Sequence, residues 1–153
     1  MALQIVELSA WGIELSEPLG DFLEILRDAG DEEGFHPHPL TRDEAARRVR
    51  YKGRDLYYAL INDGRVLAYG MLRGWDDGYT VPSLGIAVHP AERGKGLSKL
   101  MMLFLHAAAR RQMATRVRLT VDAGNIVALR LYCQLGYEFR QLGKGRLEGF
   151  AEL

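Results

Sequence analysis

The residues best suited to chemistry lie in a short cationic, glycine-rich segment, Arg93-Gly94-Lys95-Gly96. It follows an apolar run at 84–88 whose small and β-branched residues predict a buried strand. After it, apolar residues recur at helical spacing, at Leu97, Leu100, Met101, Phe104, Leu105 and Ala108. We therefore predict a strand, a tight turn and a helix, with the turn placed at the start of the helix.

Such a turn can bind an anion for a physical reason. The backbone N–H groups in the first turn of a helix have no partners within the helix, and the helix dipole is positive there. Glycines let an anion approach the backbone closely, and Arg93, Lys95 and Lys99 add positive charge. The expected ligand is a phosphate or pyrophosphate. The alternative is a plain tight turn followed by a solvated, basic helix start.

Two common phosphate-binding patterns do not occur in the sequence. The triphosphatase pattern G-x-x-x-x-G-K-[ST] is absent. The dinucleotide pattern G-x-G-x-x-G fails because Gly94-Lys95-Gly96 is followed by Leu97-Ser98-Lys99. Neither a nucleoside triphosphatase nor a dinucleotide-binding domain is therefore indicated.

Two motifs resemble those of the GCN5-related N-acetyltransferase (GNAT) superfamily. The turn resembles its acetyl-CoA loop, Q/R-x-x-G-x-G/A, with Arg93, Gly96 and Ser98 at the defined positions. Ser98 departs from the usual residue there but is still small. Downstream, residues 125–137 resemble the segment N-x-x-A-x-x-L-Y-x-x-x-G-[FY]. One predicted helix and one predicted strand separate the two motifs, and the resemblance extends over residues 56–139.

The resemblance implies a single GNAT-like domain over residues 1–153. Its α/β fold would have a central mixed, mostly antiparallel sheet of about seven strands, with about four helices on its two faces. The implied activity is that of an acetyl-CoA-dependent N-acetyltransferase, in which a primary amine of a small molecule attacks the acetyl group directly. The alternatives are a non-catalytic acyl-CoA-binding sensor and an acetyltransferase acting on a protein amine.

The resemblance also implies where acetyl-CoA would bind. Its pyrophosphate would lie against the backbone from Arg93 to Ser98, and its pantetheine arm would pair with residues 86–88 as an extra strand. A splay of the sheet beside Pro82 would make room, and a backbone N–H near Val88 would stabilise the oxyanion. The cofactor-binding residues expected are Ile86, Ala87, Val88, Arg93, Gly94, Lys95, Gly96, Leu97, Ser98 and Asn125.

Tyr132 occupies the family's position for the general acid that protonates the departing thiolate. The alternative is a core tyrosine that fills the space between a helix and the sheet. An alkylammonium substrate must first lose a proton, because its pKa is about 10.4. His36 and His38 are the candidate bases, since their loop walls the acceptor site in this family, and the alternative is a plain surface loop. No metal is expected.

The acceptor cannot be deduced from the sequence. An aromatic and imidazole mouth is expected from Phe35, His36, His38, Trp75 and Tyr79. Asp76, Asp77 and Ser83 are expected near it, and they suit a cationic amine. An amino sugar, a small amine, an amino acid and a protein N-terminus all remain open. His89 is expected to support the cofactor loop.

Composition excludes some classes of function. The 153 residues include 20 Lys and Arg and 20 Asp and Glu, so the formal net charge is zero, which argues against a nucleic-acid partner. No long apolar run or basic leader indicates a membrane partner or a secretory signal. The single cysteine, Cys133, is expected to be an inert buried thiol in a reducing compartment, which predicts a cytoplasmic protein.

The periodicities predict elements in the order strand, two helices, three meander strands, helix, strand, helix and two strands. The run Asn62-Asp63-Gly64-Arg65 predicts a hairpin turn between the first two meander strands, and Asn125 is expected to cap or precede the last helix. Ser16 is the expected N-cap of the first helix, Gly30 its stop, and Thr41 with Glu44 a capping box for the second. A strand through Pro82 is expected to be irregular. The last strand, 146–152, is expected at the sheet edge, where it would allow a homodimer to form by strand pairing.

Overall fold

A computed structural model describes residues 2–31, 34, 35 and 37–153. The strands are β1 (Gln4–Glu7), β2 (Leu56–Asn62), β3 (Arg65–Arg73), β4 (Ser83–Val88), β5 (Arg116–Asp122), β6 (Glu138–Gly143) and β7 (Arg146–Glu152). The helices are α1 (Leu8–Trp11), η1 (Gly12–Leu15), α2 (Ser16–Asp28), α3 (Arg42–Arg50), η2 (Pro90–Glu92), α4 (Leu97–Arg111) and α5 (Ile126–Gln134), of which η1 and η2 are single 3₁₀ turns. The predicted α/β class and order of elements are confirmed.

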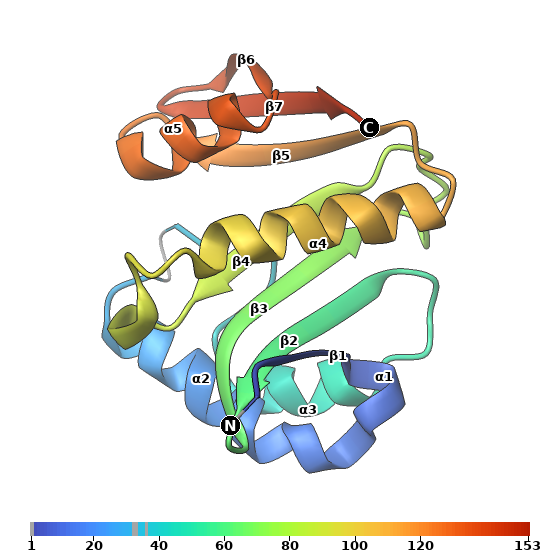
Figure 1. Cartoon of the computed structure of the whole chain (residues 1–153), viewed down its shortest axis with the longest axis vertical. Coiled ribbons are helices and arrows are strands. Elements are labelled where there is room, and N and C mark those ends of the chain that lie inside the picture. The colour runs from blue at the N-terminus through green and yellow to red at the C-terminus, as the bar shows by residue number, and fades with distance from the viewer. Residues whose placement is uncertain (1, 32–33, 36) are drawn as a thin grey trace.

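The strands form one seven-stranded mixed sheet in the order β1-β2-β3-β4-β5-β7-β6 (Figure 1). Every neighbouring pair is antiparallel except β4 and β5, which run parallel and are joined at the single register pair Ser83 and Arg118. The predicted hairpin turn between β2 and β3 is confirmed. Asp63 and Gly64 both have positive φ there, at 50° and 74°, as the tight hairpin turn requires.

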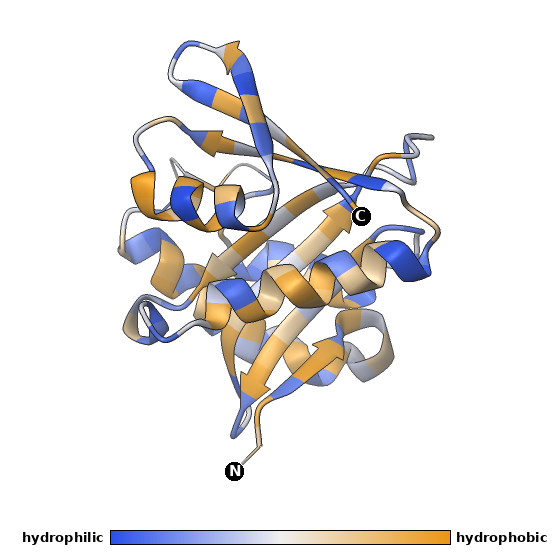
Figure 2. Ribbon diagram, turned by 45° about the horizontal axis from the view of Figure 1, so that its top comes forward, coloured by the Kyte–Doolittle hydropathy of each residue, from blue (hydrophilic) through white to orange (hydrophobic). Residues whose placement is uncertain are grey.

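The central strands are covered on both faces, which explains why they are mostly hydrophobic in Figure 2. On one face, α4 approaches so closely that a Cβ on Gly70 would lie 2.7 Å from Cε of Met101. On the other, Tyr69 and Met71 of β3 pack in a core with Phe22 of α2. The sheet therefore lies between α4 on one side and α2 with α3 on the other.

The C-terminal part of the sheet has two unlike faces. In β5, buried residues alternate with half-buried ones, and Val117, Leu119 and Val121 join the core beneath α4 and α5. The intervening Arg116, Arg118, Thr120 and Asp122 point to the other face. The register places Glu148 opposite Thr120 and Arg146 opposite Asp122, so β7 continues this polar surface.

Several details differ from the sequence predictions. Ser16 is the first residue of α2 and not its cap, because the chain enters α2 directly from η1, with Leu15 already helical. The strand β4 begins only after Pro82, so that residue does not interrupt it. Cys133 is exposed, because α5 presents that side to solvent, so the prediction of a buried thiol was wrong.

The edge position predicted for the last strand was also wrong. Strand β7 is paired with β5 on one side and β6 on the other, so β6 is the edge strand at this end of the sheet. The chain crosses from α5 to the outer position first and returns inward. A dimer formed through strand pairing would therefore have to use β6 or β1.

Three histidines should make the fold sensitive to acid. Burial lowers the pKa of His38, His89 and His106 below the usual 6.5, so each takes up a proton less readily in the folded chain than in the unfolded chain. As pH falls below about 6.5 the unfolded chain takes up protons that the folded chain does not, so stability falls. We expect the free energy of unfolding to decrease between pH 7 and 5, by at most about 1.4 kcal/mol per pH unit for each histidine.

Denaturant titrations over that pH range measure this effect. The ring Nε2 of His106 is 2.7 Å from the Tyr137 hydroxyl in the core, so His106→Gln should reduce the slope of stability against pH. Stability that does not change over this range, or an unaltered slope in the variant, would contradict the interpretation.

Candidate active site

A cleft opens where β4 and β5 separate. The strands meet at Ser83 and Arg118, and the amide of Arg118 donates to the carbonyl of Pro82 at 3.0 Å. Beyond that point they diverge around a cleft of about 150 Å³, lined by Leu84, Gly85 and Ile86 of β4 and by residues 119–122 of β5. The separation of the strands that was expected beside Pro82 therefore lies at the other end of β4, because β4 and β5 are joined next to Pro82. We call this the narrow cleft.

Helix α5 brings Tyr132 and Asn125 to the narrow cleft. Asn125 caps the helix, as predicted, by accepting the amide N–H of Ala128 on its Oδ1 at 3.2 Å. Burial raises the pKa of Tyr132 to about 12, so its phenol is protonated at neutral pH. Within the described part of the chain the Tyr132 hydroxyl has no hydrogen-bond partner, which leaves it available to a ligand.

The ring of Tyr132 is held from behind. It packs against Tyr137, with ring centroids 5.8 Å apart, and the Tyr137 hydroxyl bonds His106 of α4. This stack links α5 to α4 through the core. It fixes the orientation of the Tyr132 side chain without using its hydroxyl.

The glycine-rich turn precedes α4 at the C-terminal end of β4. Gly94 and Gly96 have φ values of 76° and 85°, a left-handed conformation that only glycine adopts readily. Gly96 is the N-cap, and no side chain of the described residues caps the helix. A Cβ at either glycine would have no described atom within 4 Å, so this part of the structure leaves the space above the turn open. The first amides of α4 thus face an open, uncapped position.

The charged side chains around the turn mostly pair with neighbouring groups and hold the turn in place. Arg93 donates from Nε to the carbonyl of Val88 at 3.2 Å and pairs with Asp31. Lys95 pairs with Glu92 at 3.0 Å. His89 accepts the amide N–H of Ala91 on Nδ1 at 3.0 Å, which agrees with its expected supporting role. The unpaired N–H groups of the backbone are therefore the main feature offered to an anion.

A second, wider cleft of about 600 Å³ adjoins the first. The two share Pro37, Leu84, Gly85, Leu119 and Thr120, so they form one continuous space. The wide cleft is lined by the cationic side chains of Arg73, Arg118 and Arg146 and by the acidic side chains of Asp55, Asp77 and Glu148. Asp77 and Ser83 lie there as expected, with Tyr79 on the rim, 67% exposed.

Glu148 is the most buried of these acids, and two guanidinium groups surround it. Arg118 donates to it at 3.1 and 2.7 Å, and Arg140 at 2.8 Å. Arg118 also donates to the Ser83 hydroxyl at 2.6 Å. Hydrogen bonds from Arg118 and Arg140 hold the pKa of Glu148 below its usual range, so it is a poor proton acceptor near neutral pH.

The two histidines expected as bases have different outcomes. His36 lies outside the described residues. His38 has its Nδ1 at 2.8 Å from the carbonyl of Pro39, an acceptor only, so Nδ1 donates. Its Nε2 then accepts from the Tyr69 hydroxyl at 2.9 Å. Both ring nitrogens of His38 are therefore engaged, and His38 lines neither cleft. Its side chain anchors the loop to Tyr69 in the core, so the geometry does not support a role as general base.

The expected aromatic mouth is only partly formed. Phe35 lines the narrow cleft and Tyr79 the wide one. Trp75 is buried in the core with Leu72, so its expected place at the mouth was wrong. Asp76 accepts the Tyr51 hydroxyl and the amide N–H of Arg54, which makes it part of a turn and not of the cleft.

A sequence profile of the acetyltransferase (GNAT) family matches residues 20–137, which is most of the chain. The chain belongs to the acetyltransferase (GNAT) family. Among curated proteins, no sequence matches it. The enzymatic class predicted from the two motifs is thereby confirmed.

Solved structures of other acetyltransferases share the fold. The PaiA N-acetyltransferase of Thermoplasma acidophilum in complex with coenzyme A has a TM-score of 0.80 at 13% identity, over 100% of both chains. A GCN5-related N-acetyltransferase from Kribbella flavida has a TM-score of 0.77 at 22% identity, over 99% of this chain and 98% of that one. The ribosomal-protein-S18-alanine N-acetyltransferase of Escherichia coli has a TM-score of 0.72 at 17% identity, over 99% and 94%.

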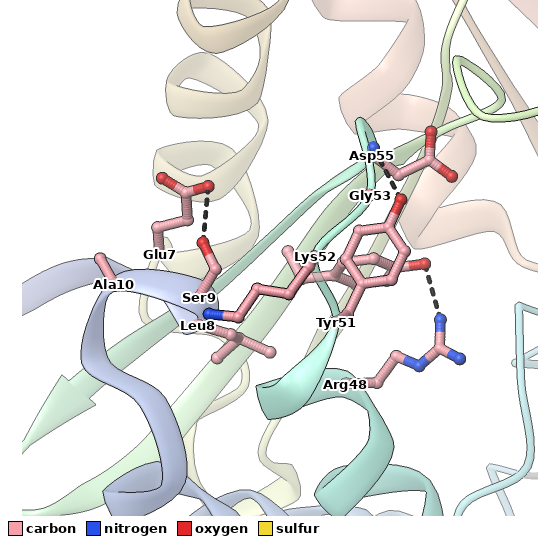
Figure 3. Close-up of a pocket in the computed structure, with 10 residues that line it drawn as sticks. Glu7, Leu8, Ser9, Ala10, Arg48, Tyr51, Lys52, Gly53 and Asp55 are labelled. Carbon is pink, nitrogen blue, oxygen red and sulfur yellow. Dashed lines mark hydrogen bonds between the residues drawn. The ribbon is translucent and has the colours of Figure 1, made fainter.

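The acetyltransferase has a further polar hollow of about 230 Å³ between α1 and the end of α3 (Figure 3). The Tyr51 hydroxyl accepts the amide N–H of Asp55 at 2.9 Å, and Arg48 donates to the Tyr57 hydroxyl at 2.9 Å. Figure 3 shows the Tyr51 ring rising toward the backbone of Asp55. Asp55 also lines the wide cleft, so the hydrogen bond from its amide to Tyr51 links the hollow to the wall of that cleft.

The part of the acetyltransferase that the structure describes has no group of three or more His, Cys, Asp or Glu side chains placed to hold a metal ion. Its described helices include none that is both long enough and apolar enough to span a bilayer.

Sequence reasoning missed Arg73, Arg118 and Glu148 as residues that line the wide cleft. Alternation along 116–121 could have placed Arg118 on a polar face. Glu148 faces the wide cleft because β7 lies between β5 and β6, and the sequence pattern does not reveal that order of strands.

Proposed function

We propose that this chain transfers the acetyl group of acetyl-CoA to a primary amine of a small molecule. The observation that carries the proposal is the divergence of β4 from β5, which opens a cleft with Tyr132 on its wall, while the glycine-rich turn follows the C-terminal end of β4. These are the parts that an extended acyl carrier with a diphosphate needs. The narrow and wide clefts then serve the acyl donor and the amine acceptor respectively.

The residues present fit coenzyme A. Residues 86–88 pair with β3 on one side only. Within the described residues their other edge makes one hydrogen bond, from Arg93 to the Val88 carbonyl, so an extended arm can bind there as an added strand would. The amides from Gly94 to Ser98 open an uncapped helix and suit the diphosphate. Arg93 and Asn125 flank these positions. Val88 and its neighbours offer an N–H to the thioester oxygen.

Acetyl-CoA supplies an activated acyl group. Two proton transfers remain, one to the departing thiolate and one from the amine. Tyr132 is placed to donate its phenolic proton to the departing thiolate. Glu148 and His38 are poorly suited to remove the amine proton, the first because of its lowered pKa and the second because both ring nitrogens are engaged. We assign that step to water in the wide cleft, whose exposed rim at Tyr79 opens to solvent.

The size of the wide cleft favours a small acceptor. Its volume of about 600 Å³ lies within the range of small-molecule sites, roughly 300–1,000 Å³. A protein amine is the alternative, because the structurally similar Escherichia coli protein is named for an alanine of ribosomal protein S18. The acceptor panel should therefore contain both kinds of amine.

Purified protein incubated with acetyl-CoA and a panel of amines tests the proposal. The panel includes alkylamines, amino acids, amino sugars, aminoalkyl phosphates and short peptides with free N-termini. We expect amine-dependent release of the coenzyme A thiol and a product heavier by one acetyl group. Tight binding of coenzyme A without turnover of any amine would contradict transfer and favour an acyl-CoA sensor.

A further inference from the structure

Arg73 is the charged group of the wide cleft whose charge is least compensated. It ends β3, and its NH1 donates to the carbonyl of Pro37 at 2.6 Å. Within the described residues no carboxylate pairs with it, whereas Arg118 pairs with Glu148 at 2.7 Å and Arg146 lies 3.7 Å from Asp122. Arg73 thus keeps donors that face the cleft without an acidic partner.

The nearby acids bind other groups or lie in solvent, and none of them contacts Arg73 within the described residues. One oxygen of Asp55 accepts the amide N–H groups of Gly74, Trp75 and Asp76 at 3.0, 2.9 and 3.3 Å. Glu148 is shared between two arginines, which leaves one positive charge in excess around it. Asp77 is exposed, where water and salt screen it. The cleft wall therefore carries as many acidic as cationic side chains, but among the described residues Arg73 is the lining arginine with no carboxylate beside it.

Arg73 also lies close to where the chemistry is proposed. In the sheet it stands opposite Ser83, and Met71 stands opposite Gly85, so Arg73 and Gly85 share a face. A Cβ on Gly85 would lie 3.5 Å from Cγ of Pro37, the residue whose carbonyl holds Arg73. Since Gly85 lines both clefts, the guanidinium is placed beside their junction.

We propose that the acceptor carries an anionic group near its amine and that Arg73 binds this group. The planar fork of a guanidinium matches both carboxylate and phosphate, so the substrate class is an amino acid or an aminoalkyl phosphate. This inference depends on the proposed acetyl transfer, because it identifies the acceptor of that reaction. Arg73 acts as a specificity-determining residue and takes no part in proton transfer.

Matched acceptor pairs test the inference. Each pair differs only in the anionic group, as in an amino acid and its amide, or an aminoalkyl phosphate and the corresponding amino alcohol. We expect kcat/KM to be at least about tenfold higher for the anionic member of one pair. The pair that shows the preference identifies carboxylate or phosphate as the group bound.

Arg73→Met should abolish the preference by lowering kcat/KM for the anionic member, and Arg73→Lys should retain part of it. Comparing one acceptor between wild type and variant cancels differences in amine pKa. Arg50→Met is the matched control, because Arg50 is exposed at the end of α3, away from both clefts. An unchanged affinity for coenzyme A would show that Arg73→Met remains folded.

The inference fails if the wild type uses neutral and anionic acceptors equally, or if Arg73→Met keeps the preference. Failure of the proposed function looks different, since no amine is then acetylated. In that event calorimetric titration with each acceptor pair, in the presence of coenzyme A, still tests whether Arg73 binds an anionic group. Tighter binding of the anionic member that is lost in Arg73→Met supports the anion site, and equal binding overturns it.

Discussion

Replacing Tyr132 by phenylalanine should lower kcat for acetyl transfer by about 100-fold and leave the Kd for coenzyme A nearly unchanged. The variant removes one oxygen and keeps the ring that packs against Tyr137 and Phe139. The expected loss is therefore confined to the proton that the phenol would donate. Stopped-flow or steady-state thiol release measures kcat, and calorimetry measures the Kd.

The raised pKa of Tyr132, about 12, is compatible with this role. The group keeps its proton over the whole neutral and mildly alkaline range, so the acid form is always present. A thiolate formed in the same dry cleft is destabilised by the same lack of water, which raises its own proton affinity. In the wild type we therefore expect no alkaline fall in kcat that is due to Tyr132 below about pH 11.

Tyr58→Phe is a matched control for this experiment. Burial also raises the pKa of Tyr58 to about 12, but that ring packs against Phe104 of α4 and lines neither cleft. Its kcat should stay close to that of the wild type. An unchanged kcat in Tyr132→Phe, or the same loss in both variants, would remove Tyr132 from the mechanism.

Gly96→Ala should weaken coenzyme A binding by about tenfold or more. The residue sits at φ 85°, where a Cβ costs about 1–2 kcal/mol, so the turn would relax away from the conformation that presents its amides. The added methyl group would also occupy the open space that the diphosphate needs. Calorimetric titration with coenzyme A gives the change in Kd directly.

Gly64→Ala separates binding from folding in that test. Gly64 has a similar φ, 74°, and equally open surroundings, but it lies in the hairpin between β2 and β3. Its loss of stability should resemble that of Gly96→Ala, while its affinity for coenzyme A should match the wild type. Equal affinities in the two variants would argue against a diphosphate at the start of α4.

The local structure around the proposed donor side was largely predictable, because local rules determine it. A glycine pair before an amphipathic helix and an Asn cap followed by Tyr132 are patterns within one segment. Their positions in the structure follow from the helix and strand that carry them. The hairpin at 62–65 and the Thr41 cap, which accepts the Glu44 amide at 3.1 Å, are equally local and were predicted.

The acceptor side was predicted poorly, because it depends on contacts between distant segments. Arg73 and Pro37 are 36 positions apart, and Arg118 and Glu148 are 30 apart. The inner position of β7 decides that Glu148 faces the wide cleft. His38 lies in a loop with two prolines, where the sequence suggested a free imidazole, yet the Pro39 carbonyl engages its Nδ1 and the Tyr69 hydroxyl its Nε2.

The most direct test of the central claim is backbone amide hydrogen exchange measured with and without coenzyme A. Coenzyme A should slow exchange in the turn at 94–98 and along 86–88, while the hairpin at 62–65 exchanges as before. Protection confined to other parts of the chain, or no protection at saturating coenzyme A, would contradict binding between β4 and β5.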